Sequence, residues 1–231
     1  MVDSATPGLI WLALGWLAYA VLHSLLAALA VKAWVTRRWP QFAPVYRLAY
    51  NVMAGVLLLP LLWATWAIPG EWLWRWTGLA GWLANGLALA ALAGFWLSST
   101  GYDMGEFLGT RALQERRRDA GEHDGLRIST LHRYVRHPWY ALGLLLIWTR
   151  DMNAPFLVSA VAITLYFVIG SRLEERKLEA HFGAAYRDYM KKVPGLFPLP
   201  GKTLSATEAD LLMQRSVERL MESSGHRQHE L

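Results

Sequence analysis

Three long apolar stretches dominate the N-terminal part of the chain, at residues 8–31, 46–68 and 79–99. Each is rich in Leu, Ala and Trp and lacks the strict alternation of a half-buried strand. Each also approaches or exceeds the length of α-helix that crosses about 30 Å of hydrocarbon. The pattern therefore predicts three transmembrane helices over these ranges and argues against membrane-spanning strands.

A second, tighter pattern follows in the C-terminal half. Residues 139–149 form an apolar run equivalent to about 17 Å of helix, which is short for a full crossing. A polar break at Arg150, Asp151 and Asn153 interrupts the pattern before it resumes over residues 154–170. We interpret this as a tight helical hairpin that returns residue 171 onward to the side of the membrane where the hairpin begins. The expected fold is an all-α polytopic membrane protein with about five transmembrane helices.

Composition supports a bilayer as the solvent, because 231 residues with 54% hydrophobic side chains and 13 Trp exceed what one water-soluble core can bury. The first apolar run does not read as a cleaved signal peptide, since nothing basic precedes it. The absence of Cys excludes disulfides, thiolate metal ligands and a cysteine nucleophile. We expect an anchor over residues 1–100, a cofactor region over 101–200 and an amphipathic tail over 201–231.

The basic residues are distributed very unevenly between the two sides of the predicted membrane. Of the 23 Lys and Arg residues, all except Arg75 and Arg150 fall on one side of this topology. The positive-inside rule then places the N-terminus outside and the C-terminus in the cytoplasm. The net charge of +5 reflects topology and contact with anionic lipid headgroups, and it does not indicate nucleic-acid binding.

Several features of the N-terminal part and the central loop carry alternatives. His23 and Ser24 lie inside an apolar run, where they would serve either as an interhelical hydrogen bond or in a substrate pocket. Residues 32–44 read as a basic, aromatic interfacial loop, and residues 105–109 suggest a turn. The highly charged residues 114–123 would be either a solvated loop or a lid over a cofactor.

Two motifs flank the predicted hairpin and should meet at its cytoplasmic end. The first is the pentapeptide Arg-His-Pro-Trp-Tyr at residues 136–140, and the second begins with Glu174 and Glu175. Glu174 shares a helix face with Leu178 and His181, whereas Glu175 points elsewhere, so one carboxylate can face inward and the other outward or toward a neighbouring helix. The simpler alternative is a juxtamembrane helix with Glu and Lys pairs on its surface.

Familiar site signatures are missing from the sequence. It contains no phosphate-binding P-loop, no dinucleotide fingerprint after a strand and no paired-histidine zinc motif, so we expect no metal site. What remains is a pocket of His, Tyr, Arg and Glu at the membrane interface. Such a pocket suits a polar cofactor that carries both ammonium and carboxylate groups.

Residues 124–198 carry a family resemblance. Arg-His-Pro-x-Tyr, a short hairpin, then Glu-Glu-x-x-Leu, Phe-Gly-x-x-Tyr-x-x-Tyr and Val-Pro resemble the membrane methyltransferases related to isoprenylcysteine carboxyl methyltransferase and phospholipid methyltransferases. The front half resembles the methanethiol S-methyltransferase and NnrU-like branch of this family. That likeness lies at His23-Ser24, Lys32, Tyr46-Arg47 and Phe107-Leu108-Gly109.

The resemblance implies a membrane methyltransferase that uses S-adenosylmethionine (SAM) without a Rossmann fold, in the inner membrane of a bacterium. The implied cofactor-binding residues are Leu126, His132, His137, Pro138, Trp139, Tyr140 and Glu174. His132 stands where these families usually have an aromatic residue. Gly170 stands where the carboxyl methyltransferases place an Arg, which favours a small thiol or another lipophilic acceptor over a prenylcysteine carboxylate.

We further predict that Arg136, His132 and Glu175 act in catalysis and that His23 contacts the substrate. Arg136 and Tyr140 would position the cofactor, and His132 or His23 would assist deprotonation of a thiol. Snorkelling toward phosphate headgroups is the alternative for Arg136. An NADPH-dependent reductase of the sterol-reductase type and a non-catalytic membrane protein are the alternative functions.

The C-terminal tail has its own signature. Ser205 and Glu208 form a capping box ahead of an amphipathic helix. One face of that helix carries an apolar stripe of Ala209, Leu212, Met213, Ser216, Val217, Leu220 and Met221. We expect this stripe to dock on the membrane surface or on the cytoplasmic loop, and the oligomeric state is left open.

Overall fold

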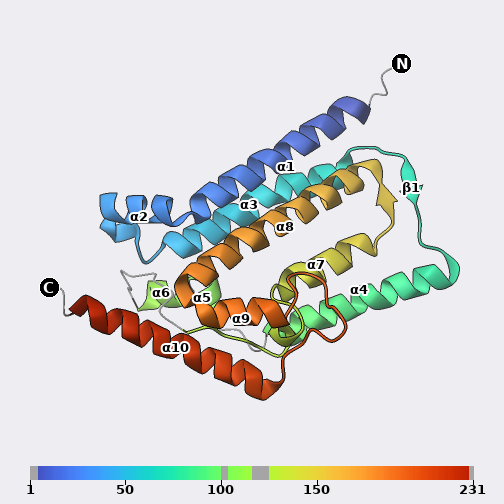
Figure 1. Cartoon of the computed structure of the whole chain (residues 1–231). Coiled ribbons are helices and arrows are strands. Elements are labelled where there is room, and N and C mark those ends of the chain that lie inside the picture. The colour runs from blue at the N-terminus through green and yellow to red at the C-terminus, as the bar shows by residue number, and fades with distance from the viewer. Residues whose placement is uncertain (1–4, 100–103, 116–124, 229–231) are drawn as a thin grey trace. The chain divides into compact units, whose positions relative to one another are not determined.

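A computed structural model describes residues 5–99, 104–115 and 125–228 (Figure 1). Four helices are long and apolar enough to cross a membrane: α1 (Ala5–Ala27), α3 (Tyr46–Ala67), α4 (Gly78–Ser99) and α8 (Ala154–Phe182). A shorter apolar helix, α7 (Pro138–Trp148), precedes α8. The chain is therefore an all-α polytopic membrane protein, as the hydrophobic pattern predicts.

The bounds of α3, α4 and α7 lie within one residue of the predicted ranges. The first helix ends earlier than expected, because Ala28 adopts an extended conformation with φ −69° and ψ 132°. The chain then forms α2 (Leu29–Arg38) and the 3₁₀ helix η1 (Pro40–Phe42), so the predicted loop over 32–44 is wrong for its first half. Arg37 and Arg38 lie in the last turn of α2, where positive charge favours the helix dipole.

The central loop begins with two short helices, α5 (Met104–Leu108) and α6 (Thr110–Gln114). Residues 105–108, predicted as part of a turn, are helical instead, and the turn lies at Gly109, which joins the two helices with φ +87°. Its backbone also packs closely against Arg47 and Leu48 of α3, where a β-carbon would clash. Most of the charged segment 114–123, predicted as a loop or a lid, lies outside the described residues.

A small antiparallel ladder between β1 (Trp72–Trp74) and β2 (Met152–Asn153) was not predicted. The two basic residues of these connections, Arg75 and Arg150, each contact neighbouring residues. Arg150 donates to the Asn85 side chain at 3.0 Å and to the Ala84 carbonyl at 3.1 Å. The guanidinium of Arg75 stacks 4.3 Å from the centre of the Trp72 ring. The connections are therefore tied to each other and to α4.

The contacts divide the chain into two compact units. Unit 1 comprises Met1–Leu89, Tyr102–Gly121 and Ile147–Tyr166, and unit 2 comprises Ala90–Gly101, Glu122–Leu146 and Phe167–Leu231. Helices α4, α7 and α8 contribute residues to both units.

In unit 1, α1, α3 and the first part of α8 run alongside one another (Figure 1). A buried polar node, formed by Trp16, Ser159 and Thr65, joins these helices. The indole of Trp16 donates to the Ser159 hydroxyl at 2.8 Å, and that hydroxyl lies 2.6 Å from the hydroxyl of Thr65. All three side chains are buried, so the node satisfies polar groups that lipid cannot solvate.

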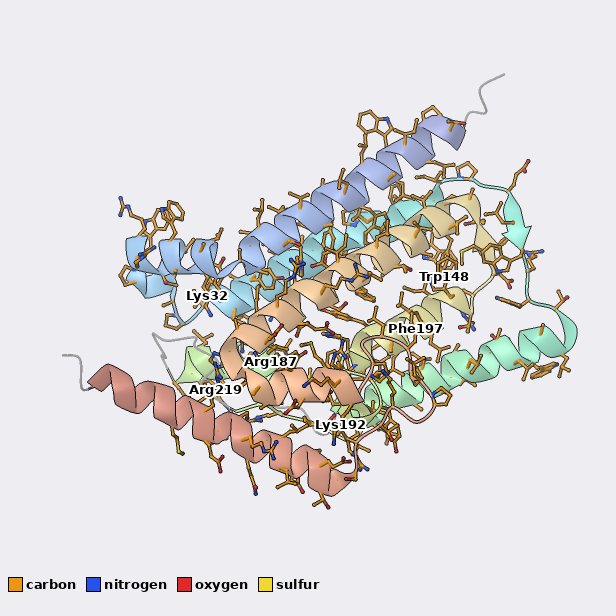
Figure 2. The ribbon with its side chains drawn as sticks, in the orientation of Figure 1. Lys32, Trp148, Arg187, Lys192, Phe197 and Arg219 are labelled. Carbon is orange, nitrogen blue, oxygen red and sulfur yellow. The ribbon has the colours of Figure 1, made fainter. Side chains whose placement is uncertain are left out.

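In unit 2, α8 ends at Phe182, and the φ of +58° at Gly183 turns the chain into α9 (Ala184–Lys192). The side chain of Arg219 from α10 (Ala206–Gln228) packs where a β-carbon of Gly183 would stand (Figure 2 labels Arg219). The core beside this junction is formed by Leu126, Ile128, Phe182, Tyr186, Tyr189, Val193, Leu204, Ala209 and Leu212. The tail helix α10 thus belongs to the core of unit 2.

The capping box at the start of α10 is confirmed. The Ser205 amide donates to the Glu208 carboxylate at 2.9 Å, and the Glu208 amide donates to the Ser205 hydroxyl at 3.2 Å. Part of the predicted stripe docks on protein, because Ala209, Leu212 and Ser216 are buried, whereas Val217 and Met221 are exposed. The Ser216 hydroxyl accepts the Leu126 amide at 2.8 Å, which ties the tail to the segment ahead of the pentapeptide.

Candidate functional site

The two motifs around the hairpin converge in unit 2. The backbone holds the first motif in place, since the Arg136 amide donates to the Pro194 carbonyl at 2.8 Å. The next amide, of His137, donates to the Gly195 carbonyl at 3.1 Å. This pairing fixes the entry to α7 against the segment that follows α9.

Arg136 is the centre of an ion-pair cluster. Its Nε and Nη2 atoms lie 2.9 Å and 2.7 Å from one carboxylate oxygen of Glu175, and the two side chains are only 12% and 16% exposed. Its Nη1 atom donates to the carbonyls of Val193 and, at 3.1 Å, Met190. The guanidinium is thus directed at protein acceptors from α8 and from the end of α9.

Both neighbouring carboxylates reach His137, which is itself buried. Its Nε2 atom lies 3.0 Å from Glu175, and its Nδ1 atom lies 3.5 Å from Glu174. Glu174 is 50% exposed, so the two carboxylates differ sharply in their access to solvent. The expected split between an inward and an outward Glu is found, with Glu175 as the more buried one.

A stack of rings lies beside these carboxylates. The Tyr140 ring is almost parallel to those of His137 and Phe167, with centroids 5.4 Å and 4.5 Å away. The Tyr140 hydroxyl lies 3.5 Å from Glu174. Sequence reasoning missed Phe167, although its position seven residues before Glu174 places both on the same face of α8.

The other two residues of the pentapeptide have structural contacts. Pro138 is buried and is the first residue of α7, a position that tolerates its missing amide hydrogen. The Trp139 indole donates to the Ser98 hydroxyl at 2.9 Å and meets the Phe95 ring edge-on. Trp139 therefore packs against the C-terminal end of α4.

His132 lies within the segment that leads to Arg136. Its Nδ1 atom lies 2.7 Å from the Ser129 hydroxyl, and its carbonyl accepts the Tyr189 hydroxyl at 2.6 Å. Burial, together with the proximity of His137, lowers the pKa of His132 to about 4. Its imidazole is consequently neutral at physiological pH.

Leu126 contributes to the core of unit 2 and to one wall of a groove. The groove, of about 560 Å³, lies between the segment Gly125, Leu126, Arg127 and the residues Met213, Val217 and Met221 of α10. Its volume falls in the range of small-molecule sites. The structure thus places Leu126 beside a cavity but directs its amide to Ser216.

His23 belongs to unit 1 and joins a cluster of phenols. The Tyr50 hydroxyl from α3 lies 2.8 Å from Nε2 of His23, and the Tyr166 hydroxyl from α8 contacts Nδ1. The Tyr19 ring, one turn earlier on α1, has its centroid 5.5 Å from that of His23. Sequence reasoning missed these tyrosines, although each is a polar tip within an apolar helix.

Comparison with known proteins identifies several similar enzymes. The chain is 34% identical over 184 residues to methanethiol S-methyltransferase 2 of Bradyrhizobium diazoefficiens, covering 78% of this chain and 69% of that protein. It is 33% identical over 190 residues to the methanethiol S-methyltransferase of Pseudomonas deceptionensis, covering 78% and 69% of the two chains. The corresponding enzyme of Mycobacterium tuberculosis is 33% identical over 193 residues, or 79% and 75%. No family model and no solved structure matches the chain.

Proposed function

The chain belongs to the methanethiol S-methyltransferase family, and we propose that it transfers a methyl group from SAM to a small thiol. The observation that carries the cofactor assignment is the meeting of Glu174, His137 and Tyr140 where α7 begins. The relatives are all named as methyltransferases, which supports a transferase over the NADPH-dependent reductase.

The residues of unit 2 fit the chemistry of this cofactor. SAM supplies an electrophilic methyl group on a positively charged sulfonium, and it also carries an ammonium group and ribose hydroxyls. The half-exposed carboxylate of Glu174 suits an ammonium or hydroxyl partner. The Tyr140 hydroxyl, which lies 3.5 Å from Glu174, suits a hydrogen bond to a polar group of the cofactor.

Arg136 and Glu175 would act by positioning in this proposal. Their mutual contacts leave His137 held between two carboxylates, so the ring that faces the cofactor has a fixed orientation. His132, neutral and partly buried, would line the same segment. The catalytic roles of Arg136, His132 and Glu175 remain predictions, as do the cofactor contacts of Pro138 and Trp139.

The nucleoside end of the cofactor would occupy the groove beside Leu126. Met213 and Val217 offer apolar contacts there, and Arg127 lies at its edge. We place this region in the cytoplasm of a bacterium, with the N-terminus outside, because nearly all Lys and Arg residues flank this side of the helices. The remaining basic residues near the membrane would contact anionic lipids.

Calorimetry with SAM and S-adenosylhomocysteine on detergent-purified protein tests the cofactor site. We expect Glu174→Gln to weaken binding roughly ten- to hundredfold, because a charge-assisted hydrogen bond is lost. His137→Ala should weaken it as well. The matched control is Glu179→Gln, a residue of the same helix whose carboxylate pairs with Arg187 at 3.7 Å.

The control should leave cofactor affinity unchanged, and Glu174→Gln should leave the melting temperature unchanged. Absence of SAM binding to the wild-type protein, with binding of NADPH instead, would overturn the proposal. Equal affinity in Glu174→Gln and wild type would overturn the assignment of Glu174 alone.

A further inference from the structure

Unit 1 contains two polar clusters of different character. The Trp16, Ser159 and Thr65 node is buried and already supplies a hydrogen-bonded link between α1, α3 and α8. The second cluster, His23 with Tyr50 and Tyr166, joins the same three helices but is only half-buried. Helix association alone does not require the second, open cluster.

Placing an ionisable ring in a membrane-spanning helix costs free energy, and such residues usually mark a substrate or proton path. His23 meets hydroxyls from α3 and α8, so its polar atoms are satisfied without water. The phenols of Tyr19, Tyr50 and Tyr166 are the titratable groups that face it among the described residues. The cluster is thus neutral and surrounded by aromatic faces.

A small thiol matches these surroundings. It is neutral and largely apolar, so it can enter from the hydrocarbon side. Its sulfur makes favourable contacts with aromatic rings. Its S–H group can donate to an imidazole nitrogen when it takes the place of one of the two phenol hydroxyls that contact the ring. Phenol hydroxyls can donate in turn to the sulfur anion that deprotonation leaves, and the thiolate is the nucleophilic form.

We propose that His23, held between Tyr50 and Tyr166, binds the acceptor thiol and takes its proton. The S–H bond breaks and the proton passes to a ring nitrogen of His23. The sulfur keeps the electron pair and would form its bond to the methyl carbon as the bond from that carbon to the sulfonium sulfur breaks, with S-adenosylhomocysteine as the leaving group. His23 later releases the proton to water. This inference rests on the proposed function, which supplies the methyl group.

The first test measures thiol binding without any cofactor. Isotope-labelled methanethiol is titrated by NMR into cofactor-free protein in lipid nanodiscs. We expect His23→Asn to weaken binding at least tenfold, and Tyr50→Phe and Tyr166→Phe, which keep the ring volume, to weaken it several-fold. Ser159→Ala, which breaks the buried node instead, should lower the melting temperature and leave thiol affinity unchanged.

The second test varies the acidity of the acceptor. Loss of a general base lowers the rate by about 10²- to 10⁴-fold. His23→Asn should show such a loss with methanethiol and a much smaller loss with thiophenol, which is already largely ionised near neutral pH. A role in packing alone would lower both rates equally.

The two proposals fail in different ways. Wild-type protein that binds no SAM overturns the proposed function, and the cofactor-free titration still decides the role of His23. Wild-type protein that methylates thiols, while His23→Asn keeps both its thiol affinity and its rates, overturns the inference. Should His23→Asn not fold, unchanged thiol affinity in both tyrosine variants would overturn it as well.

Discussion

The protein contains two clusters of histidine with tyrosine, and they are built on opposite principles. In unit 2, His137 is held by two carboxylates. One of them, Glu175, also pairs with Arg136, which donates to the backbone carbonyls of Met190 and Val193. In unit 1, the hydrogen-bond partners of the His23 ring among the described residues are the phenols of Tyr50 and Tyr166. Formal charge is present in one cluster and excluded from the other.

The difference follows from what surrounds each cluster. A buried charge is tolerated only where partners and hydrogen bonds compensate its lost hydration. The Glu175 carboxylate and the carbonyls of Met190 and Val193 supply them for Arg136. The hydrocarbon around α1 and α3 offers no such partners. Neutral hydroxyl and imidazole groups therefore cost less free energy to place there than charged groups do. Charge organises the proposed cofactor site, and neutral groups suit the proposed thiol site.

The largest expected effect comes from breaking the charged cluster. Glu175→Gln would leave the buried Arg136 guanidinium without its counter-charge, at a cost of about 3–5 kcal/mol. The melting temperature in detergent measures this loss. The matched control is Glu174→Gln, the more exposed neighbour, which should melt close to wild type. Equal melting temperatures of the two variants would contradict the proposal that Glu175 stabilises the fold and that Glu174 does not.

An intermediate effect is expected from acid. Because the folded-state pKa of His132 is about 4, below the usual value of 6.5, the unfolded chain takes up a proton first as the pH falls. His132 therefore destabilises the fold progressively between about pH 6.5 and pH 4, by roughly 2–3 kcal/mol in all. The melting temperature of His132→Asn should change less across this pH window than that of the wild-type protein. An equal change in both proteins would rule out a contribution of His132.

The smallest effect on stability is expected from the neutral cluster. Tyr50→Phe removes one half-buried hydroxyl next to His23, and a single interhelical hydrogen bond in a membrane is worth about 0.6 kcal/mol. The melting temperature should fall by a degree or two at most. A fall in melting temperature as large as that of Glu175→Gln would mean that both clusters stabilise the fold to a similar extent, which would contradict the proposed difference between them.

Local patterns in the sequence predict most of the helices. Continuous apolar runs define α3, α4 and α7, and the Ser205 and Glu208 pair marks the start of α10. The first half of the 32–44 segment was misjudged because a single extended residue, Ala28, interrupts the helix without any composition signal. The ladder of β1 with β2 pairs short segments far apart in sequence, which no local pattern encodes.

The sequence motifs predict several residues of the candidate site, but they do not predict the groups that these residues contact. Arg136, His137, Tyr140 and Glu174 could be named because they stand in recognisable spacing around the hairpin. The carbonyl partners of Arg136, at Met190 and Val193, depend on the path of the backbone around the end of α9. Every residue has a backbone carbonyl, so the sequence does not indicate which ones Arg136 contacts. The phenols that flank His23 come from two other helices, so only the packed structure of unit 1 brings them together.

Methyl transfer itself is the most direct measurement. Purified protein is incubated with methanethiol and SAM carrying an isotope-labelled methyl group, and the vapour is analysed for labelled dimethyl sulfide. We predict labelled product from the wild-type protein and from Glu179→Gln, with a large loss in Glu174→Gln. Wild-type protein that binds the cofactor yet yields no labelled thioether from methanethiol or any other small thiol would contradict the account.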